Sequence, residues 1–205
     1  MKPAAEKIKG LIFIISGPSG SGKTTLRDKL FEDKRLKSEL VKSVSLTTRK
    51  KRSGEKSGRD YFFITKDEFS SRLKANKIFE WTRYLGYYYA TARDFVEKQL
   101  KQGKNIILCL DLKGAFKIKK LYQNNSVSIF VLPPSLEALR SRIRKRCSRT
   151  RKKEIGERLK LARKELLASH RYDYVLINKN LTQATKELKA IILKEISTPP
   201  HQLRK

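Results

Sequence analysis

The chain has 205 residues, of which 39% are hydrophobic, a size and composition that suit one α/β domain with a small inserted subdomain. Its 49 Lys and Arg against 20 Asp and Glu give a formal charge of +29, and such a surface attracts polyanions. Two cysteines, Cys109 and Cys147, and two histidines exclude a disulfide framework and leave no zinc-ligand spacing.

Short apolar runs alternate with amphipathic stretches, which is typical of a parallel sheet covered by helices. The expected core strands, in chain order, are 11–16, 105–110, 128–132 and 174–178. The expected helices are 24–31, 92–102, 114–121, 135–145, 153–168 and 182–196. Residues 43–90 differ, because short aromatic-rich strands at 61–64 and 78–84 accompany a basic loop at 49–59, and this pattern predicts a small mixed insertion.

Two segments are expected to stay outside the packed core. Residues 142–153 are dense in Arg and Lys without apolar periodicity, which predicts a mobile surface segment. The tail after Ile196 is expected to fray. The basic N-terminus precedes only about six apolar residues, too few for a signal-peptide core or a membrane span, so we expect a reduced, cytoplasmic protein that does not contact membranes.

The distribution of charge separates two interpretations of the basic composition. The basic residues are spread along the whole chain rather than gathered in one tail. This favours a lysine-rich composition combined with a site for anionic nucleotides over a dedicated role on RNA or DNA. Nonspecific binding to nucleic acid through charge stays open.

A glycine-rich loop directly after the first apolar strand carries the strongest local signal. Tight turns and close backbone approach to phosphate oxygens require its glycines, the following helix offers its positive end to the anion, Lys23 supplies a charge for the β- and γ-phosphates, and the Thr24 hydroxyl is suited to hold Mg²⁺. The expected triphosphate-binding residues of this P-loop are Gly17, Pro18, Ser19, Gly20, Ser21, Gly22, Lys23, Thr24 and Thr25.

The P-loop alone leaves the reaction open, because kinases, GTPases and motor ATPases share it. A GTPase needs the guanine-specifying pattern Asn-Lys-x-Asp. The nearest candidate, Asn178-Lys179-Asn180, lacks the aspartate and is followed by apolar Leu181. We therefore discount a GTPase.

Residues after the first helix suit a second phosphate. Arg49 and Arg52 lie three apart, and Tyr61 follows nine residues later. Each guanidinium can grip two oxygens of a phosphate monoester, and a phenol can donate to a third. The pattern predicts an acceptor that carries its own phosphate.

These motifs, taken in order, resemble the guanylate kinase family, whose members transfer the γ-phosphoryl group of ATP to GMP. The resemblance runs from about Leu11 to Ile196 through GPSGSGKTT, SVSLTTRKKRSGE, GRDYFF, FEW, YYYAT, LDLKGA, FVLPPS and VLIN. It implies a P-loop NTPase-type α/β fold with a GMP-binding insertion and an arginine-rich lid. The implied activity is ATP:GMP phosphotransfer, with GMP and dGMP as acceptors, in purine nucleotide metabolism.

The resemblance assigns the acceptor residues position by position. Arg49, Arg52, Tyr61 and Tyr89 would hold the GMP phosphate, and Ser45, Glu80 and Thr91 would read guanine. The chemistry of Glu80 agrees, because guanine presents a ring N–H and an amine side by side and one carboxylate accepts from both. The neighbouring Tyr88 is expected to pack rather than bind.

Asp111 ends an expected core strand near the P-loop, where an acid orders the Mg²⁺ shell through water. The family usually carries a second carboxylate two residues earlier, where this chain has Cys109. Ala90 likewise replaces a usual glycine and Lys113 a usual glutamine.

The lid arginines implied by the resemblance are Arg142, Arg146 and Arg158, which with Lys23 and Arg49 form the expected catalytic set. Cations that close over a migrating phosphoryl group stabilise its spread negative charge and exclude water. Cys147 stands where a glycine is usual, and one extra residue separates Arg146 from Arg158. Asn178 would bond the adenine edge.

The expected organisation is a single domain with core segments 11–42, 92–141 and 159–197, a GMP-binding insertion at 43–91, a lid at 142–158 and a tail at 198–205. Two alternatives to an active guanylate kinase remain: a catalytically weak binding module with the same fold, and a related kinase whose acceptor is altered by Cys109. The sequence sets no oligomeric state.

Overall fold

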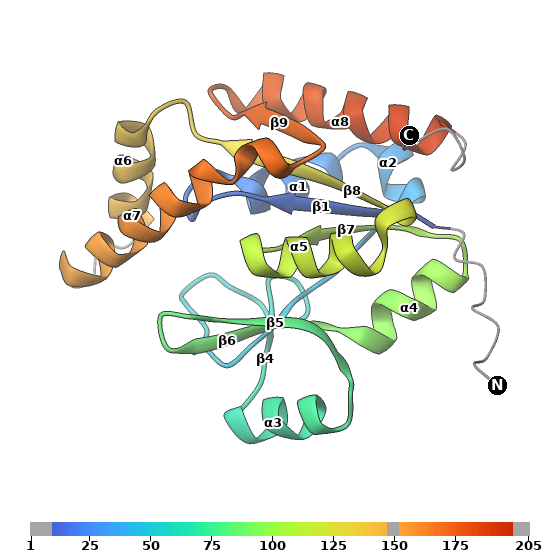
Figure 1. Cartoon of the computed structure of the whole chain (residues 1–205), viewed down its shortest axis with the longest axis horizontal. Coiled ribbons are helices and arrows are strands. Elements are labelled where there is room, and N and C mark those ends of the chain that lie inside the picture. Colours follow the sequence, from blue (N-terminus) through green and yellow to red (C-terminus); the bar gives the residue numbers. More distant parts are fainter. Residues whose placement is uncertain (1–9, 147–151, 199–205) are drawn as a thin grey trace.

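A computed structural model of the chain describes residues 10–146 and 152–198. Its centre is a five-stranded parallel sheet in the order β2-β7-β1-β8-β9 (Figure 1). The strands are β1 (Ile12–Ser16), β2 (Leu40–Lys42), β7 (Asn105–Cys109), β8 (Ser126–Leu132) and β9 (Tyr174–Ile177). Every residue of β1 is buried, because this strand lies mid-sheet and both of its faces are covered.

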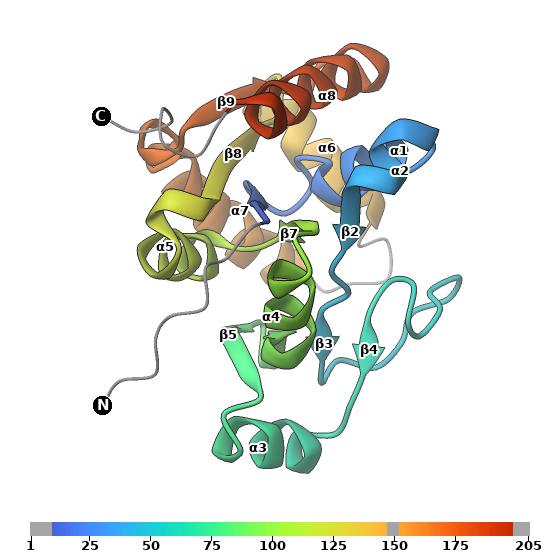
Figure 2. The ribbon, with the colours of Figure 1, turned by 90° about the vertical axis from the view of Figure 1, so that its right-hand side faces the viewer.

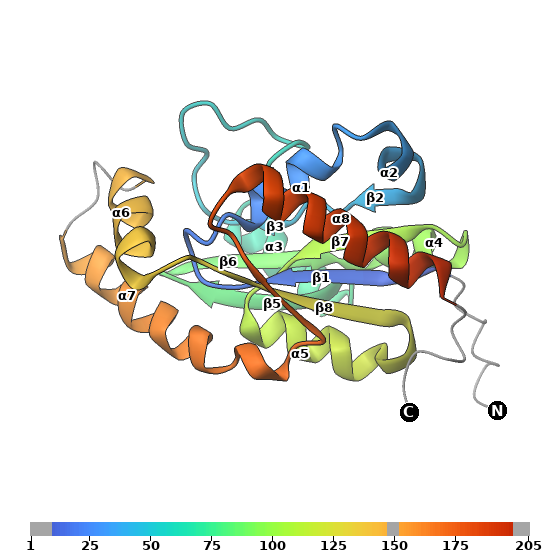
Figure 3. The same ribbon diagram turned by 90° about the horizontal axis from the view of Figure 1, so that it is seen from above.

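Helices cover the two faces of this sheet, as expected for the α/β class. On one face α1 (Lys23–Leu30) and α8 (Leu181–Ser197) pack over Phe13 and Ile15. On the other, α4 (Arg93–Lys101) and α5 (Leu112–Leu121) pack over Ile12, Ile14 and Phe130. Figures 1 and 3 show α8 on the face opposite α5. Successive β1 side chains point to opposite faces, so one short strand contributes to both cores.

A second, four-stranded sheet in the order β4-β3-β6-β5 lies beyond α4 (Figure 2). Its strands are β3 (Leu46–Thr47), β4 (Phe62–Phe63), β5 (Ile78–Tyr84) and β6 (Tyr87–Ala92), and α3 (Lys66–Lys74) packs on it. The β5–β6 hairpin turns through Leu85 and Gly86, both with positive φ (50° and 84°), which matches a two-residue turn between twisted strands.

Two helices pack against each other at the far end of the molecule. They are α6 (Leu136–Arg146) and α7 (Lys152–Leu167), joined by the contacts of Leu139, Ile143 and Ala162. The prediction of a mobile surface segment over 142–153 is therefore wrong at both ends: residues up to Arg146 belong to α6, residues from Lys152 belong to α7, and Ile143 is 1% exposed. Cys147 lies outside the described residues.

The other expected elements are confirmed to within a few residues, and some elements were missed. The helix α2 (Lys34–Glu39), the edge strand β2, and α3, β3 and β6 of the second sheet had no predicted counterpart. The start of α8 is Leu181 rather than Thr182, because the Asn180 side chain accepts from the amide of Gln183 and caps the helix. No described helix is long and apolar enough to cross a membrane.

Phe130 tests how much the central core contributes to stability. Its ring is fully buried between the sheet and α5, whereas Phe62 on β4 is 45% exposed. We expect Phe130→Ala to lower the free energy of unfolding by about 3–5 kcal/mol, because it removes packed surface and leaves a cavity. Phe62→Ala should change it by roughly 0.5 kcal/mol. Urea unfolding measures both, and similar losses in the two variants would contradict this placement of the core.

Candidate active site

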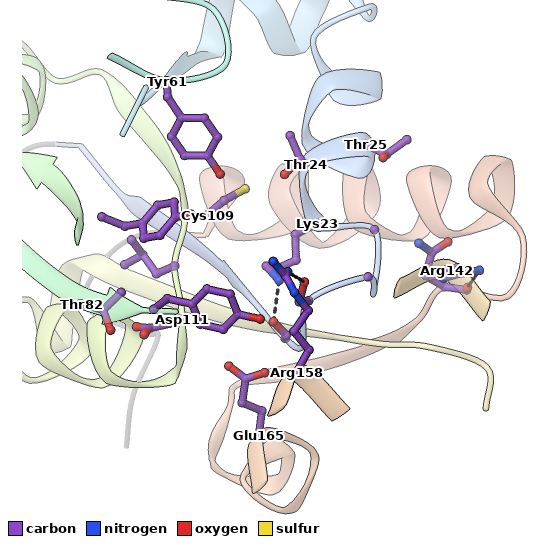
Figure 4. A pocket seen from close by; sticks show the side chains of 18 of the residues that line it. Lys23, Thr24, Thr25, Tyr61, Thr82, Cys109, Asp111, Arg142, Arg158 and Glu165 are labelled. Atoms are coloured by element: carbon purple, nitrogen blue, oxygen red, sulfur yellow. Dashed lines mark hydrogen bonds between the residues drawn. The ribbon is translucent and has the colours of Figure 1, made fainter. Parts of the chain in front are cut away.

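A cavity of about 510 Å³ opens at the carboxyl ends of β1, β7 and β9 (Figure 4). This edge of a parallel sheet is where α/β proteins bind ligands. The P-loop, the second sheet and α7 all contribute to its wall. Its lining residues are Gly17, Ser19, Gly20, Gly22, Lys23, Thr24, Thr25, Arg49, Arg52, Tyr61, Thr82, Tyr84, Tyr89, Cys109, Leu110, Asp111, Arg142, Arg158, Glu165, Asn178 and Leu181.

Two close contacts determine the shape of the P-loop. Gly17 has φ +137°, and a Cβ on it would lie 2.4 Å from the carbonyl oxygen of Val131. Gly22 has φ +99°, and a Cβ there would lie 2.2 Å from the amide nitrogen of Asn178. A side chain at either position would clash and would also disfavour the backbone conformation. The loop therefore bends against β8 and the end of β9.

The Asn178 side chain braces this loop from the end of β9. Its amide nitrogen donates to the carbonyl oxygen of Ser21 at 2.8 Å, and Arg142 donates to its backbone carbonyl at 3.1 Å. Lys23 donates to the carbonyls of Gly17 and Pro18. The contacts of Asn178 give it a structural role at the end of the strand, which was the alternative to its expected bond with adenine; that bond stays a prediction.

An ion pair orients the arginines expected to hold the acceptor phosphate. Arg49 donates to both carboxylate oxygens of Glu55, at 2.9 and 2.8 Å, and Glu55 also accepts from the backbone amide of Arg52 at 2.8 Å. Arg49 is 8% exposed; burial alone would lower its pKa, yet the Glu55 carboxylate raises it. The guanidinium therefore stays charged, and Arg49 and Arg52 line the cavity together.

Tyrosine rings complete this group, which we call the acceptor cage (Arg49, Arg52, Tyr61 and Tyr89). The carbon of the Arg49 guanidinium lies 5.4 Å from the centre of the Tyr61 ring. The Tyr61 and Tyr89 rings meet edge to face with centroids 5.9 Å apart. All four residues line the cavity, so the structure brings together the side chains that the sequence selected from three separate segments.

The expected guanine-reading residues lie deeper. Glu80 is 4% exposed and accepts a 2.6 Å hydrogen bond from the Thr91 hydroxyl, and neither residue lines the cavity. Burial raises the pKa of Glu80 to about 7; the Thr91 bond opposes this shift and the charge of Asp111 adds to it. Ser45, half-buried just before β3, also lies outside the lining, and its carbonyl accepts from Phe62.

The residues expected to hold Mg²⁺ offer hard oxygen atoms. Thr24 and Asp111 line the same cavity, and Asp111 uses one carboxylate oxygen to accept from the amide of Gly114 at 2.9 Å, capping α5. Its other oxygen is not needed for the cap. A hydroxyl and one carboxylate suit an ion that keeps most of its waters and binds substrate phosphates. The described residues hold no cluster of three or more His, Cys, Asp or Glu.

Two of the three expected lid arginines reach the cavity. Arg142 comes from α6, and Arg158, 6% exposed, comes from α7 and donates to the Ser19 hydroxyl of the P-loop at 3.3 Å. Arg146 ends α6, and the position of its side chain lies outside what the structure describes.

Several lining residues had no role predicted from the sequence, and the signal that could have identified them is periodicity. Thr82 and Tyr84 follow Glu80 at intervals of two along β5, so all three point to one face of the strand. Glu165 lies seven residues after Arg158 on α7, which places both on one helix face, and it projects beside Arg158 (Figure 4). Glu165 is 8% exposed, and burial raises its pKa to about 7, against the effect of Lys23.

Cys109 ends β7 and lines the cavity beside the P-loop, at the position where the resembling family usually has a carboxylate. Burial raises the pKa of its thiol, so the side chain is a neutral group at pH 7. Arg27 and Lys42 carry positive charges that act on this thiol, and both form ion pairs with Asp28.

The chain matches known proteins over most of its length. The family model described as guanylate kinase matches residues 9–195. This chain belongs to the guanylate kinase family. A guanylate kinase of Wolbachia pipientis is 42% identical over 189 residues, 92% of each protein, and one from Thermotoga maritima is 42% identical over 92% of this chain and 88% of the relative. The crystal structure of guanylate kinase from Anaplasma phagocytophilum superposes with a TM-score of 0.78 at 32% identity, covering 96% of this chain and 92% of that one.

Gly22 offers a direct test of the P-loop geometry. We expect Gly22→Ala to lower the free energy of unfolding by about 1–3 kcal/mol, because the methyl group would clash with Asn178 at a backbone conformation that alanine disfavours. Gly156→Ala is the matched control, because Gly156 is an exposed residue in the middle of α7 and a Cβ added there would have nothing within 4 Å. This substitution should raise the free energy of unfolding by up to ~1 kcal/mol. Chemical denaturation measures both. A Gly22→Ala protein as stable as the wild type would rule out this loop geometry.

Proposed function

We propose that this protein is an active guanylate kinase, which transfers the γ-phosphoryl group of ATP to GMP or dGMP and releases ADP with GDP or dGDP. The observation that carries the proposal is that the P-loop and the acceptor cage line one cavity of about 510 Å³. One group of residues suits a triphosphate and the other a phosphate monoester, so the two phosphates would face each other.

The P-loop forms the donor half of the proposed site. Its backbone and the amino end of α1 favour an anion, and Lys23 adds a point charge. Thr24 and, through water, Asp111 would hold Mg²⁺, which when bound with ATP neutralises part of the phosphate charge. Asn178 supports the loop from the end of β9. We propose that its side chain also hydrogen-bonds the edge of the adenine base.

The acceptor cage forms the other half, within the insertion at 43–91. Arg49 and Arg52 bind the oxygens of the GMP phosphate, and the hydroxyl groups of Tyr61 and Tyr89 donate hydrogen bonds to the same phosphate. Ser45, Glu80 and Thr91 read the guanine. Glu80 already accepts from Thr91, and its carboxylate can also accept from the ring N–H and the adjacent amine of guanine. Adenine does not present two donors side by side, because the ring nitrogen next to its amine is an acceptor.

Phosphoryl transfer needs positioning and charge stabilisation more than a chemical group from the protein. The GMP phosphate is itself the nucleophile, so no side chain forms a covalent bond. Arg142 and Arg158 come from the lid at 142–158 and, with Lys23, stabilise the charge on the transferred group while the walls exclude water. We include Arg146 in this set because of its place in the family pattern.

The alternatives find less support. A binding module with the same fold has no need for a complete P-loop, and this chain retains one with its braces intact. A related kinase with another acceptor would leave the buried Glu80–Thr91 pair without a guanine to read. We further propose a cytoplasmic location, which suits a protein with two cysteines and no described membrane-crossing helix.

A coupled assay of five acceptors with ATP and Mg²⁺ tests the function. We expect turnover with GMP and dGMP, and little with AMP, UMP or IMP. Lys23→Ala should abolish turnover and leave the cooperative unfolding transition in place, because the two hydrogen bonds described for its ammonium are made within the loop itself. A preference for any other acceptor would overturn the roles of Ser45, Glu80 and Thr91, and a fully active Lys23→Ala enzyme would overturn the mechanism.

The pKa of Glu80 predicts how GMP affinity changes with pH. The carboxyl is protonated below about 7, and only its ionised form accepts from both guanine N–H groups. The ionised fraction rises about tenfold from pH 6 to pH 8, so KM for GMP should fall about tenfold over that range. The groups facing Glu80 are the Thr91 hydroxyl, Asp111 and Lys117.

The variant Glu80→Gln separates this effect from titration of the GMP phosphate, which both enzymes experience. Its KM should be higher throughout, and the part of the pH dependence that belongs to Glu80 should disappear. An unchanged pH profile in Glu80→Gln would show that another group is responsible.

A further inference from the structure

A continuous series of ring contacts joins the acceptor cage to a lid arginine. Arg49 lies over Tyr61, Tyr61 meets Tyr89 at 5.9 Å, and Tyr89 meets Tyr84 with ring centroids 6.4 Å apart and planes 74° apart. The guanidinium carbon of Arg158 lies 5.4 Å from the centre of the Tyr84 ring. Figure 4 labels Tyr61, which lies next to Arg49 at one end of the series, and Arg158 at the other end. Tyr84 is the member that reaches from the insertion to the lid.

The backbone fixes where Tyr84 points. It is the last residue of β5 and pairs with Tyr87 across the two-residue turn at Leu85 and Gly86. Because a short hairpin turn sets the register of its strands, the backbone of Tyr84 keeps a fixed place relative to β6, which carries Tyr89. The Tyr84 hydroxyl is buried close to Ser19 and Arg158, and no described residue makes a hydrogen bond of standard geometry with it. The contacts with Tyr89 and with the Arg158 guanidinium are made by the ring.

Arg158 depends on neighbours from three parts of the molecule. It is 6% exposed on α7, and it donates to Ser19 of the P-loop at 3.3 Å while Tyr84 covers it from the second sheet. A long side chain has many rotamers, and a flat aromatic face in a desolvated site favours the rotamer that places the cation over it. Tyr84 thus restricts Arg158 to the position above the P-loop.

We propose that Tyr84 is a positioning residue that couples the two nucleotide sites, holding Arg158 over the donor phosphates when the acceptor cage is occupied. This inference rests on the proposed GMP kinase function. A phosphate on Tyr61 and Tyr89 orders those rings, the ordered Tyr89 ring orders Tyr84, and Tyr84 orders Arg158. By linkage, each nucleotide then tightens the binding of the other by the same factor.

Calorimetry measures the coupling without turnover. The titrant is the β,γ-methylene analogue of ATP with Mg²⁺, added to the full chain with and without saturating GMP. We expect GMP to tighten analogue binding at least about fivefold in the wild type. A wild type that neither binds nor phosphorylates GMP would overturn the proposed function. A wild type that phosphorylates GMP yet shows no coupling would overturn only the role of Tyr84.

Three variants separate the ring from the hydroxyl and from the hairpin. Tyr84→Leu should remove the coupling and lower kcat about tenfold, while the Kd for GMP measured without ATP or its analogue changes by less than about threefold. Tyr84→Phe keeps the ring and should restore both coupling and kcat. Tyr87→Leu, at the paired position whose side chain is 42% exposed, controls for damage to the hairpin and should behave as the wild type. A Tyr84→Phe protein as impaired as Tyr84→Leu would assign the effect to the hydroxyl and overturn the proposal.

A double-mutant cycle shows whether Tyr84 acts through Arg158. If it does, Tyr84→Leu has no further effect on kcat in an Arg158→Ala background. Additive losses would mean that the two residues act independently and would overturn the proposal. Thermal unfolding of each variant confirms that the comparison is made between folded proteins.

Discussion

A loop that binds phosphate must turn its backbone N–H groups toward the anion, and it must hold this shape against its own tendency to relax. In this protein the loop between β1 and α1 is held from outside. The Val131 carbonyl limits Gly17, and the Asn178 amide limits Gly22 and bonds the carbonyl of Ser21. These braces come from β8 and β9, so the donor site depends on the parallel pairing of β1 with β8 and of β8 with β9.

Specific neighbours also explain how a chain with a formal charge of +29 holds several cations inside a small cavity. Each buried cation that the proposed mechanism uses is held by a specific neighbour. Glu55 grips Arg49 with both oxygens, and Ser19 and the Tyr84 ring hold Arg158. Glu165 faces Lys23 from α7. Two carboxyl groups, those of Glu55 and Glu165, therefore lie beside cations that line the cavity.

How much could be predicted depends on how local each signal is. The central strands are continuous apolar runs, because both faces of the sheet are covered, and the P-loop is a contiguous motif, so both were predicted from sequence. The strand β2 spans three residues and is half-buried, too short to show a pattern. The helix α3 did carry a signal, since Thr65 caps it by accepting from the amide of Glu68, and this was overlooked.

The residues of the site also divide into those that a local motif marks and those that only the fold brings together. The acceptor cage residues could be named because a motif carries each of them, whereas Tyr84 and Glu165 gain their meaning from contacts across the fold. Glu80 was expected in the binding cavity and instead lies behind its lining, bonded to Thr91. No linear pattern encodes that depth, which results from the packing of β5 against α5.

That packing has a consequence for how the family position at Gly114 can vary. A Cβ on Gly114 would lie 2.6 Å from a carboxylate oxygen of Glu80, although Gly114 itself does not line the cavity. Any larger residue would push Glu80 from its place beside Thr91. A residue in the first turn of α5 thereby limits where the Glu80 carboxylate can lie, although it contributes nothing to the cavity wall.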